Sequence, residues 1–329
     1  EMRVSVNPGS ADAQSGNQYL PRIAAGADGD LVIVWRDDNG NDGSGYGVFG
    51  RSFDAASGSF GDVFLVNQVT GGAQYEPDVA MFADGSFVVV WRDDNGLDGS
   101  GSATFGRRFD AAGVALGNAF LVNENTGGSQ YQPKVTALST GGFVVAFYND
   151  TGDYWGDTYI REFDAAGNPV DSDRRVHSDE VGAYRYQYEP AITDLGNGSF
   201  VVAWRADNNA DGSGSGIFGQ RFNADGSADG AQFRVNSYID STQAQPAVAA
   251  LGAGAFVVVW TSYGQDGSAQ GVYGQRYDAA GNPAGAEFRV NYTIAGDQLR
   301  PAVTGLANGG FVVTWDDGSN VWLQQYDAG

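Results

Sequence analysis

The sequence predicts an all-β protein, a six-bladed β-propeller whose blades are four-stranded antiparallel sheets. Three observations lead to this prediction. A segment of about 56 residues occurs six times, which indicates an array of supersecondary units. Each copy alternates apolar and polar residues with a period near two, and glycine-rich turns separate the alternating stretches. Four short strands per copy, repeated in series, are typical of propeller blades.

A proline and an aromatic residue mark the period. Subtracting neighbouring positions in either series gives 56, 56, 57, 56 and 55. The near-constant length predicts one array rather than separate domains. The prolines are Pro21, Pro77, Pro133, Pro190, Pro246 and Pro301, and the aromatic residues are Trp35, Trp91, Phe147, Trp204, Trp260 and Trp315.

The second copy illustrates the four strands. Its first strand is expected near 78–82, a tight turn leads to the second at 86–91, and a longer loop leads to the third near 103–109. A second turn precedes a fourth strand that ends at Val122. In every copy the second strand is almost entirely apolar, as in FVVVW and FVVAW. Such strands are expected to be buried on both faces, between neighbouring blades.

The ends of the chain suggest how the array closes. The last copy stops at Tyr326, after its third strand, and residues 2–7 (MRVSVN) match the ends of the fourth strands elsewhere. We therefore expect one domain, residues 1–329, in which residues 1–7 complete the last blade and remove an open sheet edge. The expected blades are 18–67, 74–123, 130–176, 187–236, 243–291, and 298–329 with 1–7.

Composition excludes several functions. The formal net charge of −22 repels nucleic acid and anionic membranes, but it leaves divalent cations and neutral ligands as partners. Cysteine is absent and His177 is the only histidine, so thiolate sites, zinc sites and the usual nucleophilic triads lack their residues. His177 stands where other copies have asparagine, which favours a structural role. No apolar run is long enough to span a membrane.

Acidic loops that follow three of the second strands suggest calcium. The loop RADNNADGSG fits the opening D-x-[DN]-x-[DN]-G of a calcium loop, in which alternate oxygen ligands face inward. Two other loops, both of the form RDDNGxDGSG, keep only two of the carboxylates. The alternative is that Asp, Asn and Gly simply form good turns. The candidate ligands are Asp207, Asn209 and Asp211, with Asp38, Asp42, Asp94 and Asp98 in the other two loops.

Polar and aromatic side chains are expected to share one face of the propeller. In an up-and-down blade, the Q-x-x-P segments and the loops after the second strands lie at the same end, so amides, tyrosines and arginines would surround the mouth of the channel. Tyrosine beside amides suits sugar binding, and arginine suits a carboxylate, although packing and salt bridges are the alternatives. The candidate ligand-binding residues are Gln18, Tyr19, Arg36, Gln74, Tyr75, Arg92, Gln130, Tyr131, Gln187, Tyr188, Arg205 and Trp155.

Two glutamates offer a different function. Glu76 and Glu189 occupy the same position, in QYEP, on the second and fourth blades. Two carboxylates that face each other across a mouth are what glycoside hydrolysis requires, one as the acid and the other as base or nucleophile. The alternative function is therefore a glycoside hydrolase or lyase. A third interpretation is a structural protein that uses the propeller as a docking platform.

The segments FVVVWRDDNGLDGSGSATFGRRFDAAG and FVVVWTSYGQDGSAQGVYGQRYDAAG resemble repeats of large secreted bacterial proteins, the RTX-type exoproteins and adhesins. The resemblance covers nearly the whole chain. It implies an extracellular or cell-surface location, possible membership of a larger secreted protein, and a role in binding a carbohydrate or cell-surface glycan. The main prediction is thus a non-catalytic, carbohydrate-binding module with calcium-ordered loops. The GGxGxD nonapeptides of RTX proteins are absent, so their calcium roll is not implied.

Overall fold

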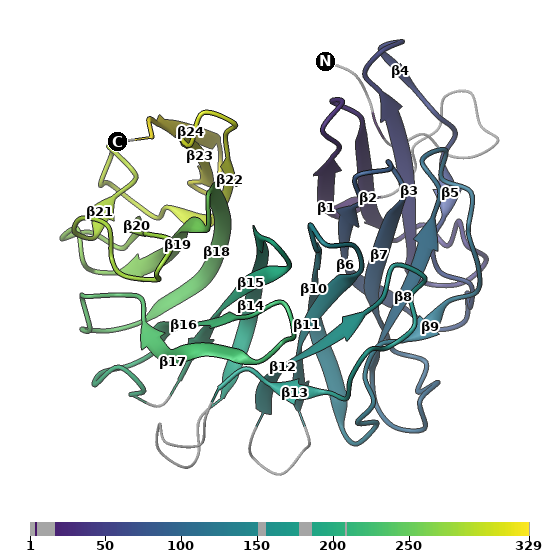
Figure 1. The fold of residues 1–329 in the computed structure, drawn as a ribbon, viewed down its shortest axis with the longest axis horizontal. Helices are drawn as coiled ribbons and strands as arrows, with labels where there is room; N and C mark the ends of the chain where they lie inside the picture. The colour runs from purple at the N-terminus through teal and green to yellow at the C-terminus, as the bar shows by residue number, and fades with distance from the viewer. Residues whose placement is uncertain (1–3, 5–16, 151–155, 178–185, 208, 329) are drawn as a thin grey trace. The chain divides into compact units, whose positions relative to one another are not determined.

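The computed structural model describes residues 4, 17–150, 156–177, 186–207 and 209–328. Within these residues the chain contains β-strands, turns and loops but no helix, and therefore no helix that could span a membrane. The strands form six antiparallel sheets that follow one another along the chain (Figure 1). The predicted fold class, an all-β six-bladed propeller, is confirmed.

The chain divides into two compact units, which are described separately. Unit 1 comprises Glu1–Ala137, Gly141–Gly152 and Ile160–Arg174, and unit 2 comprises Leu138–Thr140, Asp153–Tyr159 and Arg175–Gly329. Blades 1 and 2 lie in unit 1, blades 4 to 6 lie in unit 2, and the strands of blade 3 are shared between the units.

The fourth strands of blades 1 to 3 are short. In blade 1 two short strands, β4 and β5, both pair with β3. Blade 1 consists of β1 (Gln18–Ala25), β2 (Leu31–Asp37), β3 (Gly47–Asp54), β4 (Ser59–Phe60) and β5 (Phe64–Leu65). Blade 2 consists of β6 (Gln74–Met81), β7 (Phe87–Asp93), β8 (Ala103–Phe109) and β9 (Phe120–Leu121). Blade 3 consists of β10 (Ser129–Ala137), β11 (Phe143–Asp150), β12 (Gly156–Phe163) and β13 (Arg174–Arg175).

Blades 4 and 5 repeat the order, and blade 6 has three strands among the described residues. Blade 4 consists of β14 (Gln187–Gly196), β15 (Ser199–Ala206), β16 (Gly216–Phe222) and β17 (Ala228–Arg234). Blade 5 consists of β18 (Gln243–Gly252), β19 (Ala255–Tyr263), β20 (Gln270–Tyr277) and β21 (Phe288–Arg289). Blade 6 consists of β22 (Leu299–Gly305), β23 (Phe311–Asp316) and β24 (Val321–Tyr326).

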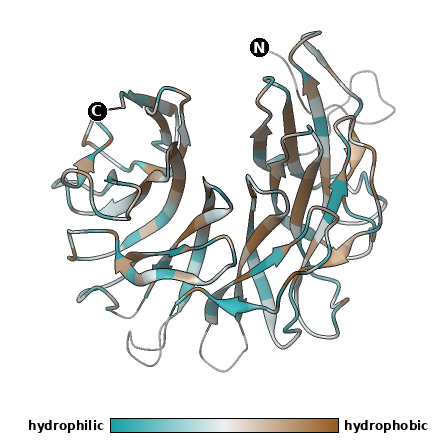
Figure 2. Cartoon of the chain, in the orientation of Figure 1, coloured by the Kyte–Doolittle hydropathy of each residue, from teal (hydrophilic) through white to brown (hydrophobic). Residues whose placement is uncertain are grey.

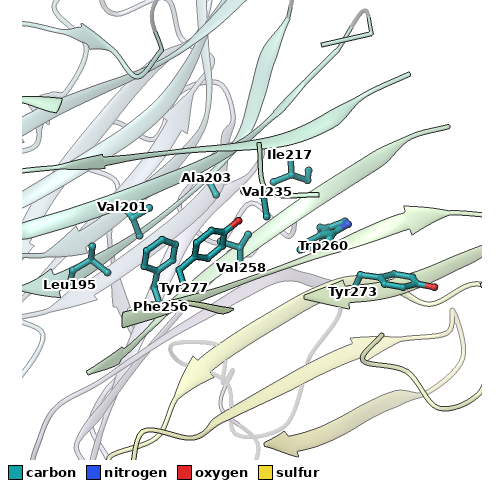
Figure 3. Packing of buried hydrophobic residues seen from close by; sticks show 10 residues of the cluster. All are labelled: Leu195, Val201, Ala203, Ile217, Val235, Phe256, Val258, Trp260, Tyr273 and Tyr277. Carbon is teal, nitrogen blue, oxygen red and sulfur yellow. The ribbon is translucent and has the colours of Figure 1, made fainter. Parts of the chain in front are cut away.

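The second strand of each blade forms the core, as its apolar sequence predicts. Along β15 and β19 the side chains that face opposite sides of the sheet, such as Val201 and Val202, are both fully buried. These strands are among the most apolar parts of the chain (Figure 2). Figure 3 shows the core between blades 4 and 5, where Phe256, Val258 and Trp260 of β19 pack with residues of blade 4. Burial of such side chains is the main favourable term in folding.

A glycine in the third strand makes room for an aromatic ring of the fourth. A Cβ on Gly219 of β16 would lie 2.7 Å from Cζ of Phe233 on β17. The same contact recurs between Gly106 and Phe120, where the distance would be 2.6 Å. Real Cβ atoms do not approach this closely, so glycine is required for packing rather than for an unusual backbone angle. Gly50 with Phe64 and Gly274 with Phe288 repeat the arrangement.

Val4, the one described residue before Asn17, contacts blade 1. Nη1 of Arg51 donates a hydrogen bond to the Val4 carbonyl at 3.1 Å. In the next blade Arg107 donates in the same way to the carbonyl of Val66, which follows β5. Val4 thus takes the role that a residue at the end of a fourth strand has elsewhere. The remaining residues of the predicted closing strand lie outside the described residues, so closure by residues 1–7 stays a prediction.

Candidate functional site

An unusual backbone position marks the start of every blade. The residue before each blade's first proline has a positive φ, between 51° and 56°, although none of the six is a glycine. The first strand bulges there, because its pairing with the second strand shifts register between Tyr188 and Ala191 in blade 4 and at the equivalent place in the other blades. Strained non-glycine residues cost free energy and often occur at functional sites. The six residues are Leu20, Glu76, Gln132, Glu189, Gln245 and Arg300.

Several of these side chains connect one blade to the next. Oε2 of Glu76 accepts a hydrogen bond from the backbone N–H of Gln132 at 2.7 Å. In unit 2, Oε2 of Glu189 accepts one from the N–H of Gln245 at 2.7 Å, and Oε1 of Gln245 accepts one from the N–H of Arg300 at 2.9 Å. Both predicted catalytic glutamates therefore also have a structural partner. Glu76 belongs to unit 1 and Glu189 to unit 2, so their use as a pair stays a prediction.

Glu189 lies in a cluster of polar side chains in unit 2. Its Oε1 is 3.7 Å from Nη1 of Arg205, on the neighbouring strand β15. The Arg205 Nε also donates to Oδ1 of Asp207 at 3.0 Å, so one guanidinium contacts two carboxylates. Tyr188 donates its hydroxyl to Oδ2 of Asp207 at 2.7 Å, and its ring lies 4.8 Å from the Arg205 guanidinium carbon. Ser215 donates a further hydrogen bond to Asp207.

Burial raises the pKa of two groups in this cluster. Desolvation raises the pKa of Glu189, although the hydrogen bond from Gln245 and the charge of Arg205 oppose the rise. Desolvation also raises the pKa of Tyr188, and its hydrogen bond to Asp207 acts in the same direction. A carboxyl group with a raised pKa retains its proton to higher pH than an exposed glutamate, which a general acid requires.

The arginines of unit 1 are flanked by tyrosines. The Arg36 guanidinium carbon lies 4.7, 4.9 and 5.5 Å from the ring centres of Tyr19, Tyr46 and Tyr75. Arg92 lies 5.1 Å from the ring of Tyr75 and 4.3 Å from that of Tyr131. Tyrosines and arginines therefore alternate along blades 1 to 3. The sequence predicted that both residue types lie at one end of the blades, but it did not predict that the rings and guanidinium groups alternate.

Most of the glutamines that were expected to surround a mouth are buried inside the blades, and their part in ligand binding stays a prediction. Gln74 and Gln130 are fully buried and Gln187 is 5% exposed. Gln74 accepts a hydrogen bond from Nδ2 of Asn67, and Gln187 accepts one from the indole of Trp204. Buried amides are stable only when they are hydrogen bonded, which explains why glutamine recurs inside the blades. Gln18, which donates to Asp37, is half-buried.

An asparagine after the fourth strand is the centre of this internal network. Oδ1 of Asn236 accepts from the N–H of Ile217, and Nδ2 donates to Asp211, to the Tyr238 carbonyl and to Gln243. Asn67, Asn123 and Asn291 have the same role. His177 replaces the asparagine in blade 3, where its Nε2 lies 2.9 Å from Oδ1 of Asp157.

The acidic loop residues also have donors within the protein. Asp42, Asp98 and Asp211 each accept a hydrogen bond from one of these asparagines and from a backbone N–H two residues later. Asp38 accepts from the N–H of Asn17, Asp94 pairs with Arg92, and Asn209 accepts from the N–H of Gly214. The described residues contain no group of three acidic or histidine side chains arranged around a common point. Calcium binding stays a prediction. Trp155 lies outside the described residues.

One charged cluster on the first strands was not predicted. Arg22 and Asp78 form an ion pair at 3.7 Å, and Oδ2 of Asp78 also accepts from the N–H of Val135 at 2.9 Å. Beside them stands Lys134, on the third blade's first strand. Desolvation lowers the pKa of the Lys134 ammonium, while the charge of Asp78 opposes the change. The sequence did not point to Lys134, because the equivalent position in the other blades holds different residues.

Solved structures with a similar fold include several glycosidases. An α-L-arabinanase of Penicillium chrysogenum, solved with arabinobiose, matches with a TM-score of 0.62 and 13% identity over 94% of this chain and 93% of its own. An α-L-arabinofuranosidase of Fusarium graminearum matches with a TM-score of 0.61 and 12% identity over 94% and 92%. The NanB sialidase of Streptococcus pneumoniae has a TM-score of 0.57 and 8% identity over 99% and 68%. No protein-family model and no curated protein matches the chain.

These comparisons correct the main functional prediction. The similar structures with a stated activity are glycoside hydrolases, which favours the alternative prediction over a non-catalytic carbohydrate-binding module. The six-bladed propeller is confirmed, but the similar solved structures with a stated activity are glycosidases and not RTX-type exoproteins. At identities this low, the likeness establishes the fold alone.

Proposed function

We propose that this protein is a glycoside hydrolase and that Glu189 is its general acid. The observation that carries the proposal is the environment of Glu189 in unit 2. Its carboxyl group is mostly buried, its pKa is raised by desolvation, and it lies beside the Arg205 guanidinium. Glycosidases need one such protonated carboxyl group to donate a proton to the leaving oxygen.

Asp207 is the second carboxylate in this proposal. It contacts the same guanidinium as Glu189 and is fixed in position by hydrogen bonds from Tyr188, Arg205 and Ser215. Glycoside hydrolysis requires a second carboxylate in a different environment, as base or nucleophile. The two carboxylates differ in this way, since Glu189 is held by a backbone N–H and Asp207 by three side chains.

Arabinofuranosides are the first substrates to test, because the similar structures include an α-L-arabinanase and an α-L-arabinofuranosidase. The wild-type protein should release 4-nitrophenol from an aryl α-L-arabinofuranoside, and aryl sialosides and other aryl glycosides complete the panel. On arabinan, whose leaving oxygen is strongly basic, Glu189→Gln should lower kcat/KM by roughly 100-fold or more, as expected for the loss of a general acid. Glutamine still offers an oxygen to the Gln245 N–H, so this variant should fold.

Glu76→Gln is the matched control, because Glu76 occupies the same position in blade 2 and also accepts a hydrogen bond from the next blade. If the activity depends on the chemistry of Glu189 and not on this inter-blade bond, Glu76→Gln should retain most of it. Equal losses in both variants would assign the effect to the structure, and full activity of Glu189→Gln would refute the proposed role.

A further inference from the structure

Arg36 differs from the arginines at the equivalent position of the other blades in having no polar partner. Arg92 pairs with Asp94 at 2.7 Å, and Arg205 contacts both Asp207 and Glu189. Among the residues that the structure describes, Arg36 takes part in no ion pair and no hydrogen bond, and its Nε is buried without a partner. An N–H donor that is buried without an acceptor costs free energy.

Two sequence differences explain why Arg36 is unpaired. Blade 1 has Leu20 where blade 4 has Glu189, so the acid that faces Arg205 is absent. Blade 1 also has Tyr46 where blade 2 has Ser102, and Ser102 is the residue that bridges Arg92 and Asp94. The nearby carboxylate of Asp38 accepts instead from the backbone N–H of Asn17 at 2.8 Å. Both changes therefore remove partners that the equivalent arginines retain.

Three tyrosines replace the lost polar partners. The rings of Tyr19, Tyr46 and Tyr75 surround the Arg36 guanidinium at cation–π distances. Cation–π contacts use the flat faces of a guanidinium and leave the N–H donors in its plane for an anion. The site is open to solvent, because Tyr19 is 40% and Leu20 is 39% exposed.

We infer that Arg36, Tyr19, Tyr46 and Tyr75 form a binding site in unit 1 for the carboxylate of an acidic sugar. The planar donor fork of arginine matches a carboxylate and can hold it through two hydrogen bonds. The exposed faces of Tyr19 and Leu20 offer an apolar surface beside it, on which the carbon face of a pyranose can pack.

The site does not depend on the proposed hydrolase activity, since all its residues belong to unit 1 and none to the Glu189 cluster. The net charge of the protein does not favour the binding of an anion at this site. The formal charge of −22 repels a free anion, so binding has to come from local contacts with Arg36.

Binding of sodium glucuronate, measured by calorimetry or by NMR titration at low salt, tests the inference. Glucose is the neutral counterpart of the same shape, and acetate supplies a carboxylate without the sugar. We expect glucuronate to bind at least about tenfold more tightly than glucose or acetate, as one charge-assisted pair predicts. Binding of glucose or acetate as tight as that of glucuronate, or no detectable binding of glucuronate, would overturn the inference.

Two variants separate recognition by Arg36 from a general loss of structure. Arg36→Gln should abolish the preference for glucuronate. Leu20→Glu keeps the arginine and all three tyrosines but gives Arg36 the acidic partner that Arg205 has. It should therefore weaken glucuronate binding about tenfold or more. The melting temperature should be maintained or rise. An unchanged preference for glucuronate in Arg36→Gln would show that Arg36 does not bind the carboxylate. Hydrolysis can be measured separately in the same variants.

Discussion

The carboxylate of Glu189 accepts a hydrogen bond from the backbone N–H of Gln245 at 2.7 Å, and so joins the first strand of blade 4 to that of blade 5. Glu76 makes the same bond to Gln132 in unit 1. The residue with positive φ before the proline thus has two properties. It connects consecutive blades, and in blade 4 it is Glu189, whose pKa desolvation raises, as the proposed function requires.

We predict that the inter-blade bond of Glu76 contributes measurably to stability. Glu76→Ala removes the acceptor and leaves the N–H of Gln132 unpaired, at a cost of about 1–3 kcal/mol. Glu76→Gln keeps an acceptor of the same shape and should cost less than half as much. Urea denaturation of the two variants measures the difference. Equal stability of both would mean that solvent satisfies the Gln132 N–H.

The pH dependence of stability should report on Glu189. Its pKa in the folded protein is raised above the ordinary value of 4.5, so the folded state holds this proton where the unfolded state has released it. The contribution of Glu189 to stability is therefore fully present below pH 4.5 and is lost as the pH rises through the folded-state value. Glu189→Gln lacks this loss, so its stability relative to wild type should improve between pH 4 and pH 7. A constant difference between the two proteins would contradict the assignment.

The asparagine at the end of the fourth strand should be among the most sensitive positions of the fold. Asn236→Ala removes the acceptor of the Ile217 N–H and the donor to Oε1 of Gln243 and Oδ2 of Asp211. We expect a loss of about 3–5 kcal/mol in unfolding free energy, since several buried polar groups lose partners together. Differential scanning calorimetry measures it. A loss below about 1 kcal/mol would mean that water replaces the amide.

Packing between the third and fourth strands predicts a second sensitive position. Gly219→Ala places a methyl group 2.7 Å from the ring of Phe233, which has to move out of the core. The expected cost is about 1–3 kcal/mol, typical of overpacking. The double variant Gly219→Ala with Phe233→Leu should recover part of the loss. Additive effects of the two changes would show that the ring and the glycine are not in contact.

The repeat made the fold predictable. Six copies with the same apolar second strand and the same turns determine the blades, because strand burial and turn geometry depend on local sequence. The polar roles were harder to predict. Gln74 and Asn67 are both polar and recur in most copies, yet they bond to each other inside the blade. Periodicity places a residue along a strand, but it does not distinguish a buried, satisfied amide from one at a solvent-facing mouth.

The candidate sites depend on departures from the repeat. Arg36, Arg92 and Arg205 have the same place in three copies, and the sequence alone treats them alike. Arg36 differs because the residues sixteen positions before and ten positions after it are Leu20 and Tyr46, where the other two copies have glutamate and serine. A comparison of the copies at those two positions would have identified Arg36, but only after the structure showed which positions contact the guanidinium. Calcium binding and the extracellular location stay predictions.

The most direct test of the central claim is the dependence of hydrolysis on the leaving group in wild type and in Glu189→Gln. A general acid matters most when the leaving oxygen is strongly basic, as in arabinan, and least for a 2,4-dinitrophenyl glycoside, which departs without a proton. If Glu189 is the acid, the variant should lose roughly 100-fold or more of the polysaccharide activity and far less of the dinitrophenyl activity. Equal losses on both substrates, or no hydrolysis of any glycoside by the wild-type protein, would contradict the account.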